Sequence, residues 1–376
     1  AEAGARVIVC DEQAEFGGSL LDGATARIDA EPAEVWVTAA VAALAGSTRV
    51  RLLSRTTAFG YFPHNNVGLV ERLTDHLADA LPGAVRERLW QVRAREVVLA
   101  TGAIEQPLVF PGNDRPGIML AGAARTFLKR YGVRAGTRAV VVTAADGACR
   151  AAADLEAAGT EIAAIADLRK GIRVDGTRGN RRVRAVEIDG KSIACDLVLM
   201  SGGYAPSVHL FSQSRGRLAW SDSTRCFVPS QSAERERSAG ACRGVFGLAA
   251  ALSDGAAAGI AAARACGYES ATLHFGVVGD DTSGDMSPAG AQAPAGAGSK
   301  AFVDFQNDVT AKDLALAVQE GFRSIEHVKR YTTAGMATDQ GKTSNLNVLG
   351  IVAGQLGKAV PEIGHTTFRM PYTPVS

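Results

Sequence analysis

Strand-sized apolar runs alternate with segments of helical period along the first 278 residues. Residues 7–10 form the first run, residues 33–46 carry apolar positions at helical spacing and end in glycine, and residues 48–99 are rich in strand-like alternation. A second strand, helix and strand follow over 139–166, and a long apolar helix lies within 238–267. This order predicts an α/β protein with parallel strands.

The stretch "RVIVCDEQAEFGGSLL", residues 6–21, is typical of the second strand of a dinucleotide-binding unit. Its apolar run ends in Asp11 and Glu12, and a carboxylate at such a strand end accepts hydrogen bonds from the ribose hydroxyls of NAD or FAD. The first strand of the unit and its G-x-G-x-x-G turn are expected about 20 residues earlier, where this sequence has no room for them. The alternative is that both acids only cap a strand in solvent.

Two later strands also run into turns of small residues. One ends at Thr101-Gly102, where small residues would let the backbone approach a bound dinucleotide, although an isolated "ATG" also arises by chance. The other strand runs into the turn "TAADGACR" of the second strand-helix-strand unit. This turn has one glycine, Gly147, where phosphate loops need two or three, and Asp146 would repel a pyrophosphate. We therefore expect the second unit to be structural.

Composition and charge exclude several functions. The 40 basic and 39 acidic residues are interspersed and give a net charge of +1, so we expect no nucleic acid and no membrane as partner. No apolar run reaches the length of a membrane span, and no signal peptide opens the chain. The six cysteines form no C-x-x-C pair, which indicates a reduced, cytoplasmic compartment. The six histidines show no metal-ligand spacing, so no metal site is assigned.

The last quarter of the chain has a different pattern. Residues 279–299 are small, polar and rich in proline and glycine, which predicts a linker. A helical segment follows from 300 to about 354, where Thr310 and Asp313 form a capping-box variant and "AKDLALAVQEGFRSIEHVKRY" continues at helical period. An extended tail closes the sequence.

Four stretches carry a resemblance to a known family. They are "DEQAEFGGSL", "VVLATGAIEQPLVFPGNDRPGIMLAGAARTFL", "FVDFQNDVTAKDLALAVQEGFRSIEHVKRYTTAGMATDQGKTSNLNVLGI" and "TTFRMPYTPVS". Their order resembles the two-dinucleotide-binding-domain flavoprotein fold of thioredoxin reductases, a Rossmann-type α/β fold. Their amino-acid sequences resemble those of the α subunits of heterotetrameric sarcosine oxidases. Those α subunits also carry an N-terminal segment with the first strand and glycine loop, and a C-terminal folate-binding aminomethyltransferase domain, so the chain is interpreted as a central portion.

The resemblance implies a division of the chain. We expect an incomplete first dinucleotide-binding domain, an inserted second Rossmann-like domain, a return to the first domain, a linker, a small helical domain resembling a [2Fe–2S] module, and a lead-in to a further domain. The boundaries are 1–136, 137–205, 206–278, 279–299, 300–354 and 355–376, in that order.

The resemblance also implies cofactor contacts in the first domain. In flavoprotein relatives a late Gly-Asp holds the FAD ribitol, and the matching place here is Gly240-Ala241, whose alanine cannot make that contact. This favours NAD, or another adenine nucleotide, over FAD. By matched positions Asp11 and Glu12 would hold the adenosine ribose. Gly17 and Gly18 would let the backbone approach, and Thr101-Gly102 would line the cleft.

In the helical segment, alignment to the [2Fe–2S] module places Asp304, Gln306, Asp339 and Ser344 where the four cysteines would be. Without thiolates, iron–sulfur ligation is excluded. In the family FMN lies between the α and β subunits, with its covalent attachment on β. The turn bearing Gln340, Lys342, Thr343 and Ser344 is therefore a candidate FMN contact, with Lys342 opposite the flavin phosphate or a reduced flavin. An ordinary helix-capping turn is the alternative.

The function implied is that of one subunit in an oxidoreductase. The assembly, with β, γ and δ subunits, would convert sarcosine to glycine and hydrogen peroxide, with methylenetetrahydrofolate formed from tetrahydrofolate, or formaldehyde without it. FAD would lie in the β subunit, where amine oxidation would occur, and this chain alone would not be catalytic. The alternatives are a subunit of an amino-acid or opine dehydrogenase, an independent NAD(P)H-dependent flavoprotein reductase, and a purely structural domain.

Overall fold

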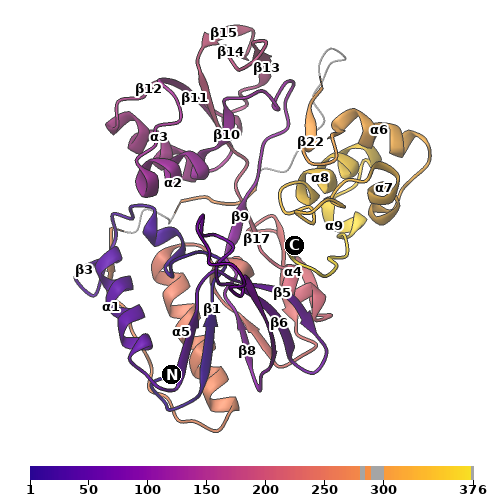
Figure 1. The fold of residues 1–376 in the computed structure, drawn as a ribbon. Helices are drawn as coiled ribbons and strands as arrows, with labels where there is room; N and C mark the ends of the chain where they lie inside the picture. Colours follow the sequence, from indigo (N-terminus) through magenta and orange to yellow (C-terminus); the bar gives the residue numbers. More distant parts are fainter. Residues whose placement is uncertain (280–283, 289–299, 374–376) are drawn as a thin grey trace.

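A computed structural model describes residues 1–279, 284–288 and 300–373. In the lower part of Figure 1, strand β1 (Val7–Cys10) pairs in parallel with β4 (Val50–Leu53). Strand β8 (Val97–Leu99) pairs in parallel with β20 (Glu236–Ser238), and helix α5 (Leu248–Ala265) packs against both. Helix α1 (Ala33–Ala45) ends at Gly46, as its sequence predicts. The predicted first strand and first helix are therefore confirmed.

The strands β1 and β8 each keep one unpaired edge within the described residues. Ile8 on β1 is 42% exposed and Val98 on β8 is 41% exposed. The strands of a parallel sheet are ordinarily buried on both faces, and an unpaired edge is ordinarily short or covered. The first nucleotide unit is thus present as two separate parallel pairs.

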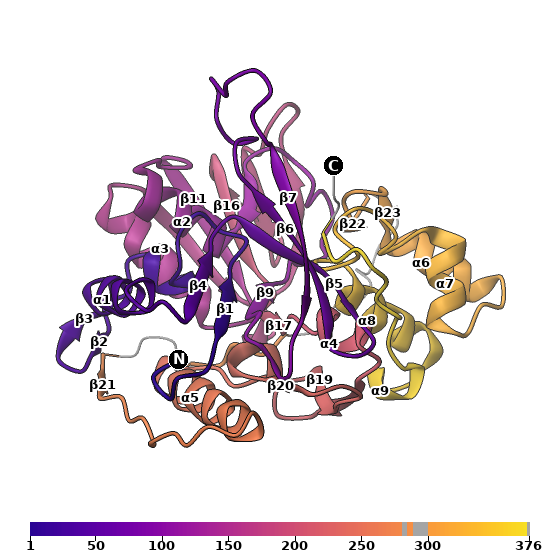
Figure 2. The same ribbon diagram turned by 60° about the horizontal axis from the view of Figure 1, so that its bottom comes forward.

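Smaller β elements surround this part. An antiparallel sheet, which rises through the centre of Figure 2, is built from three strands: β5 (Thr56–Phe62), β6 (Asn66–Arg72) and β7 (Glu87–Arg93). Short antiparallel ladders join β2 (Arg27–Ile28) to β3 (Glu31–Pro32) and β21 (Val277–Val278), and β18 (Arg217–Ser221) to β19 (Cys226–Gln231). The predicted β-rich stretch is confirmed. Single 3-10 turns occur at Gly18–Leu21, Leu168–Lys170 and Gly240–Arg243.

The second unit is a complete parallel sheet, seen in the upper left of Figure 1. Its strand order is β10 (Ile118–Leu120), β16 (Leu197–Ser201), β11 (Arg138–Thr143), β12 (Glu161–Asp167). Apolar side chains of α2 (Ala121–Tyr131) and α3 (Gly147–Ala157) bury one face of this sheet. The other face packs toward the antiparallel strands β13 (Val174–Arg178), β14 (Ala185–Ile188) and β15 (Lys191–Ala194). The predicted strand, helix and strand over 139–166 are confirmed.

Two short strands join the two units. Strand β9 (Ala103–Glu105) follows β8, strand β17 (Tyr204–Pro206) follows β16, and the two pair in an antiparallel ladder. Helix α4 (His209–Gln213) comes next. Gly202-Gly203 separate β16 from β17, with Gly203 at a φ of +92°. The break turns the chain out of the parallel sheet and into this joint.

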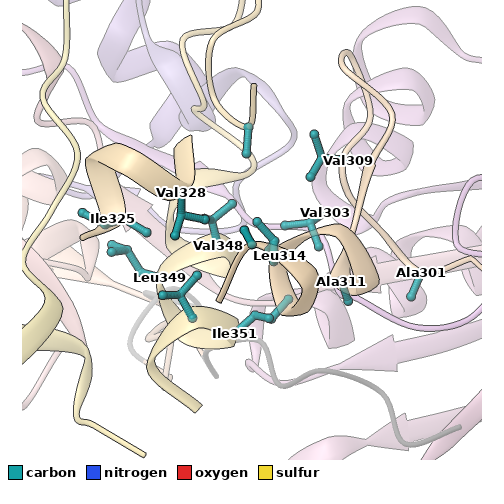
Figure 3. Packing of buried hydrophobic residues seen from close by; sticks show 13 residues of the cluster. Ala301, Val303, Val309, Ala311, Leu314, Ile325, Val328, Val348, Leu349 and Ile351 are labelled. Atoms are coloured by element: carbon teal, nitrogen blue, oxygen red, sulfur yellow. The ribbon is translucent and has the colours of Figure 1, made fainter. Parts of the chain in front are cut away.

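The helical segment has its own core, shown in Figure 3. It comprises a hairpin of β22 (Phe302–Asp304) and β23 (Val309–Thr310), then α6 (Ala311–Gln319), α7 (Ile325–Thr332), α8 (Asn345–Leu356) and α9 (Val360–Ile363). The predicted capping box is confirmed, because the Thr310 N–H donates to Asp313 at 2.8 Å. The helical pattern predicted over 311–331 is confirmed, as two helices. Glu320 ends α6, Gly321 takes a φ of +98°, and α7 begins only at Ile325.

No helix within 1–279, 284–288 and 300–373 is long and apolar enough to cross a membrane.

Most of the predicted linker, residues 279–299, lies outside the described residues. Its described part, 284–288, lies against the second unit.

Candidate functional site

The carboxyl end of β1 presents the two acids that the sequence singles out. Asp11 is half-buried, and its Oδ1 accepts the Gln13 N–H at 2.8 Å. The backbone of Asp11 bonds to Leu53 and Thr56, which fixes its place beside the end of β4. Glu12 is exposed. A carboxylate held here by the sheet, with one oxygen engaged by the local turn, retains acceptor capacity for ribose hydroxyls.

The two glycines after this strand differ. Gly17 has a φ of +141°, and a Cβ there would lie 2.9 Å from the Leu21 side chain and 3.0 Å from Val37 of α1. A glycine at position 17 is therefore explained by the close packing of Leu21 and Val37 against its backbone. Gly18, at a φ of +55°, would carry a Cβ with nothing within 4 Å, so its backbone is open on that side.

The turns after β8 and β20 lie side by side, because these strands are paired. The Thr101 hydroxyl donates to the Ser207 carbonyl at 2.8 Å, and Gly102 has a φ of +71° with open space around it. The Gly240 N–H donates to Asp254 Oδ2 at 2.7 Å, and Arg243 pairs with the same carboxylate at 2.8 Å. Sequence reasoning missed Asp254. Its signal was a single acid within the otherwise apolar run of α5.

The corresponding turn of the second unit is covered by residues 284–288. Asp146 and Asp285 are joined through their backbones, and the Asp285 N–H also reaches Asp146 Oδ2 at 2.7 Å. Arg169 pairs with Asp146 at 2.7 Å, and this pairing holds the pKa of the Asp146 carboxyl below its ordinary value. A Cβ at Gly203 would lie 2.6 Å from the Ser287 carbonyl oxygen. The space above this turn, where a dinucleotide would lie, is thus filled by the chain itself.

A buried acid at the joint was also missed. Glu105 on β9 is 8% exposed, and its Oε2 accepts the Gly122 N–H at the start of α2 at 2.8 Å. Burial raises the pKa of Glu105 to about 7, while the hydrogen bond from the Gly122 N–H opposes the shift. The only sequence signal was an acid inside an apolar strand.

The turn between α7 and α8 holds the candidate FMN contacts, and they face different surroundings. Lys342 Nζ donates to the Tyr372 carbonyl at 2.6 Å and lies 3.9 Å from the centre of that ring. Gln340 takes a φ of +54° and donates from its amide to the Ala337 carbonyl. Thr343 donates to Asp339 at 3.3 Å, while Ser344 is 1% exposed. Lys342 is therefore the cation that this turn presents, and Ser344 belongs to the interior.

The first strand end and this turn are electrostatically linked. Burial lowers the pKa of Lys342, and the carboxylates of Glu12 and Asp339 act in the opposite direction. The same Glu12 charge, after burial, helps to raise the pKa of Tyr372. Glu12 at the end of β1 and Lys342 before α8, which are far apart in sequence, are thus close enough for their charges to interact.

The four positions aligned with cluster cysteines lie in two turns that are joined by hydrogen bonds. Asp304, 2% exposed, accepts the N–H groups of Gln306, Asn307 and Gly335. Gln306 Oε1 accepts from Thr338 and from the Asp339 N–H. These bonds tie the turn after β22 to the turn before α8. Among the described residues, no three His, Cys, Asp or Glu side chains form a group able to hold a metal ion.

The arrangement as a whole defines the class of protein. Over 98% of this chain, the structure superposes on 73% of an L-proline dehydrogenase from P. horikoshii with a TM-score of 0.80 at 20% sequence identity. The expected fold is thereby confirmed: the chain has a two-dinucleotide-binding-domain α/β fold like that of this flavoprotein.

Sequence comparisons identify the particular relatives. The chain is 42% identical, over its whole length, to 40% of the sarcosine oxidase α subunit of Rhizobium meliloti strain 1021, and residues 298–376 match the family described as the sarcosine oxidase A3 domain. The resemblance to sarcosine oxidase α subunits is thus confirmed, and the chain spans about two fifths of their length. It is also 24% identical, over its whole length, to 93% of an opine oxidase subunit from the same species.

Proposed function

We propose that this chain is the central, cofactor-holding part of an α subunit in a sarcosine oxidase complex. The observation that carries the proposal is the 42% identity to such an α subunit over the whole chain. The complex would oxidise the N-methyl group of sarcosine, leaving glycine. Oxygen would be reduced to hydrogen peroxide, and the carbon would be released as formaldehyde or transferred to tetrahydrofolate. We assign the oxidation itself to FAD in a partner β subunit and give this chain no general base.

The proposed role of the first unit is to bind NAD. Asp11 lies at the carboxyl end of a parallel strand and keeps an oxygen beyond its bond to Gln13, which fits a ribose diol. Gly18, Gly102 and Gly240 each have backbone at positive φ. Ala241 offers no side-chain acceptor for a ribitol. The glycine loop for the pyrophosphate is assigned to a further segment of the parent protein, which would fill the open edges of β1 and β8.

The proposed role of the helical segment is to complete an FMN site against the β subunit. Lys342 forms no ion pair with a carboxylate of the described residues, and it is partly desolvated. Such an ammonium is stabilised by an anion, and a flavin phosphate or a reduced flavin ring supplies one. Gln340 and Thr343 are placed on the same turn, whereas buried Ser344 would support the turn from within. The γ and δ subunits complete the proposed assembly.

An opine or amino-acid oxidising complex is the second candidate. The observation in its favour is the full-length similarity to the opine oxidase subunit of Rhizobium meliloti, a protein of nearly the same extent as this chain. An independent NAD(P)H-dependent reductase is disfavoured, because residues 284–288 fill the second nucleotide turn.

A cofactor-release assay tests the proposal. The full-length protein is purified with its natural partners and denatured with acid, the supernatant is analysed for NAD, FAD, FMN and ATP, and the pellet is analysed for covalent flavin. The proposal predicts stoichiometric NAD and FAD in the supernatant and FMN linked to protein. FAD bound to this chain alone, without FMN in the complex, would contradict it. Oxygen consumption with sarcosine and with opines then separates the two candidates.

A further inference from the structure

A buried acid at the joint of the two units has no part in the proposed function. Strand β9, which Figure 1 shows between the two units, carries Glu105. The Oε2 atom of this side chain accepts the N–H of Gly122, the second residue of α2, at 2.8 Å. Its Oε1 atom is buried and has no hydrogen-bond partner among the described residues. Because buried polar atoms are nearly always hydrogen-bonded, an ionised Glu105 lacks one donor in this arrangement.

The charged and titratable groups around this acid come from the elements packed against it: Arg125 on α2, Arg150 and Asp154 on α3, and Tyr204 on β17. Arg125 is engaged by Asp154 at 2.6 Å. Arg150 favours the ionised carboxyl group of Glu105, but burial outweighs this charge and raises the pKa of Glu105 to about 7. From residues 284–288, the uncharged side chain of Met286 approaches this region beside Gly147. Burial is therefore the main influence on the protonation of Glu105.

Helix α2 connects this acid to the first unit. The Thr126 hydroxyl donates to Asp22 Oδ2 at 3.0 Å. Arg130 pairs with Glu15 at 2.9 Å, but this carboxylate is 68% exposed, so the pair contributes little by itself. Both partners lie in the turn after β1 that also contains Gly18. A change at the buried start of α2 therefore reaches the turn that follows the candidate nucleotide-binding strand.

Ionisation of Glu105 changes the balance at the joint. The protonated carboxyl group is neutral in this buried place and still accepts the Gly122 N–H. The ionised group carries a charge that burial disfavours, and one of its oxygens has no donor among the described residues. Opening of the joint would hydrate both oxygens. Gly102, just before β9, permits such a movement, because it has a φ of +71° with nothing within 4 Å of its Cβ position.

We propose that Glu105 is a proton-controlled latch: protonated, it holds the start of α2 against β9, and ionised, it releases α2 and the turn of residues 15–23 that α2 contacts. The joint is accordingly closed at acidic pH. Its opening constant rises with pH between the ordinary pKa of the carboxyl group, 4.5, and the pKa of about 7 in the closed joint, and it is constant above that range. The inference rests on the joint alone and does not depend on the proposed function.

Amide hydrogen exchange tests the latch on the full-length protein with its partners. Rates at pH 5.5 and 7.5 are divided by the intrinsic exchange rates at each pH, which gives the opening constant of each segment. We expect this constant to rise about tenfold or more over residues 15–23, 103–105 and 118–126, since a carboxyl group with these two pKa values shifts the opening equilibrium by that much. Strand β11, in the core of the second unit, should not change. An equal rise in β11, or no rise at the joint, overturns the proposal.

Variants identify the titrating group. Glu105→Gln keeps an acceptor for the Gly122 N–H but cannot ionise, so the joint is expected to exchange slowly at both pH values. Glu156→Gln removes an exposed acid of α3 and is the matched control, which should keep the full rise. A pH dependence that persists in Glu105→Gln overturns the proposal.

Infrared difference spectroscopy gives a second measurement that needs no variant. Exposed carboxyl groups ionise mostly below pH 5.5, so a protonated carboxyl band that disappears between pH 5.5 and 7.5 reports a buried acid. We expect this band to disappear in step with the rise in hydrogen exchange at the joint. A rise in exchange without loss of the band overturns the proposal, because a group other than a carboxyl would then open the joint.

Discussion

The two strand-helix-strand units share a geometry and differ in what lies over their turns. In the first, the strand end at Asp11 is open, and Gly18 and Gly102 have free space around them. In the second, Arg169 pairs with Asp146 and residues 284–288 lie on the turn. A parallel strand running into a helix is therefore insufficient evidence for a nucleotide site. The contacts of the turn decide whether a ligand can enter.

The largest expected effect is on NAD affinity. Asp11→Ala removes the carboxylate that would accept hydrogen bonds from both ribose hydroxyls. Because hydrogen bonds to a charged group are strong, we expect a loss of about 3 kcal/mol in binding free energy, or a rise of over 100-fold in Kd. Asp146→Ala, the matched change in the second unit, is expected to leave Kd within about twofold. Equilibrium dialysis with labelled NAD measures both. Equal losses in the two variants would contradict the assignment of NAD to the first unit.

The next effect concerns Glu105 at the joint. Its folded-state pKa of about 7 lies above the ordinary 4.5, so the folded protein binds the proton more tightly than the unfolded chain does. The contribution of Glu105 to the free energy of unfolding is accordingly fully present below about pH 4.5. It is lost as the pH rises toward 7, by an amount on the order of 2–3 kcal/mol. Glu105→Gln keeps an acceptor for Gly122 and should flatten this dependence. Urea unfolding between pH 4.5 and 8 measures it, with the exposed Glu156→Gln as control. A slope unchanged from that of the unaltered protein would exclude Glu105 as its source.

Two matched glycines compare packing over the turns. Gly102→Ala and Gly203→Ala both place a side chain at positive φ, but only the second meets backbone, at 2.6 Å from Ser287. We expect Gly203→Ala to cost about 2 kcal/mol more than Gly102→Ala, because residues 284–288 must shift. Denaturant unfolding gives the difference, and hydrogen exchange should rise at 284–288 in Gly203→Ala alone. Similar costs would show that these residues do not pack tightly on the turn.

The smallest effect concerns the ion pair of the second turn. Arg169→Met removes the partner of Asp146, which is 45% exposed, so we expect a loss below about 1 kcal/mol that shrinks further in salt. NAD binding should not change. Thermal unfolding at low and high salt measures the loss, and a larger, salt-independent loss would mean that Arg169 acts through packing.

The sequence predicted features that depend on neighbours close in the chain. The helix over 33–46, the strand over 7–10 and the Thr310–Asp313 cap follow from periodicity and local hydrogen bonding. The predicted domain boundaries and site residues stay predictions. Contacts between distant segments were not predictable. The cover over Asp146 comes from residues nearly 140 positions away, and the pKa of His209 is lowered by burial in a place where its ring contacts Phe368 and Tyr372, about 160 positions away.

The hydrogen bonds around Asp304 have a consequence for how the molecule is made. Asp304 and Gln306 join two turns with groups that the chain itself encodes, and residues 300–376 contain no cysteine. The helical segment reaches its final shape as soon as it folds. Because it holds no thiolate, its folding does not depend on the assembly of an iron–sulfur cluster.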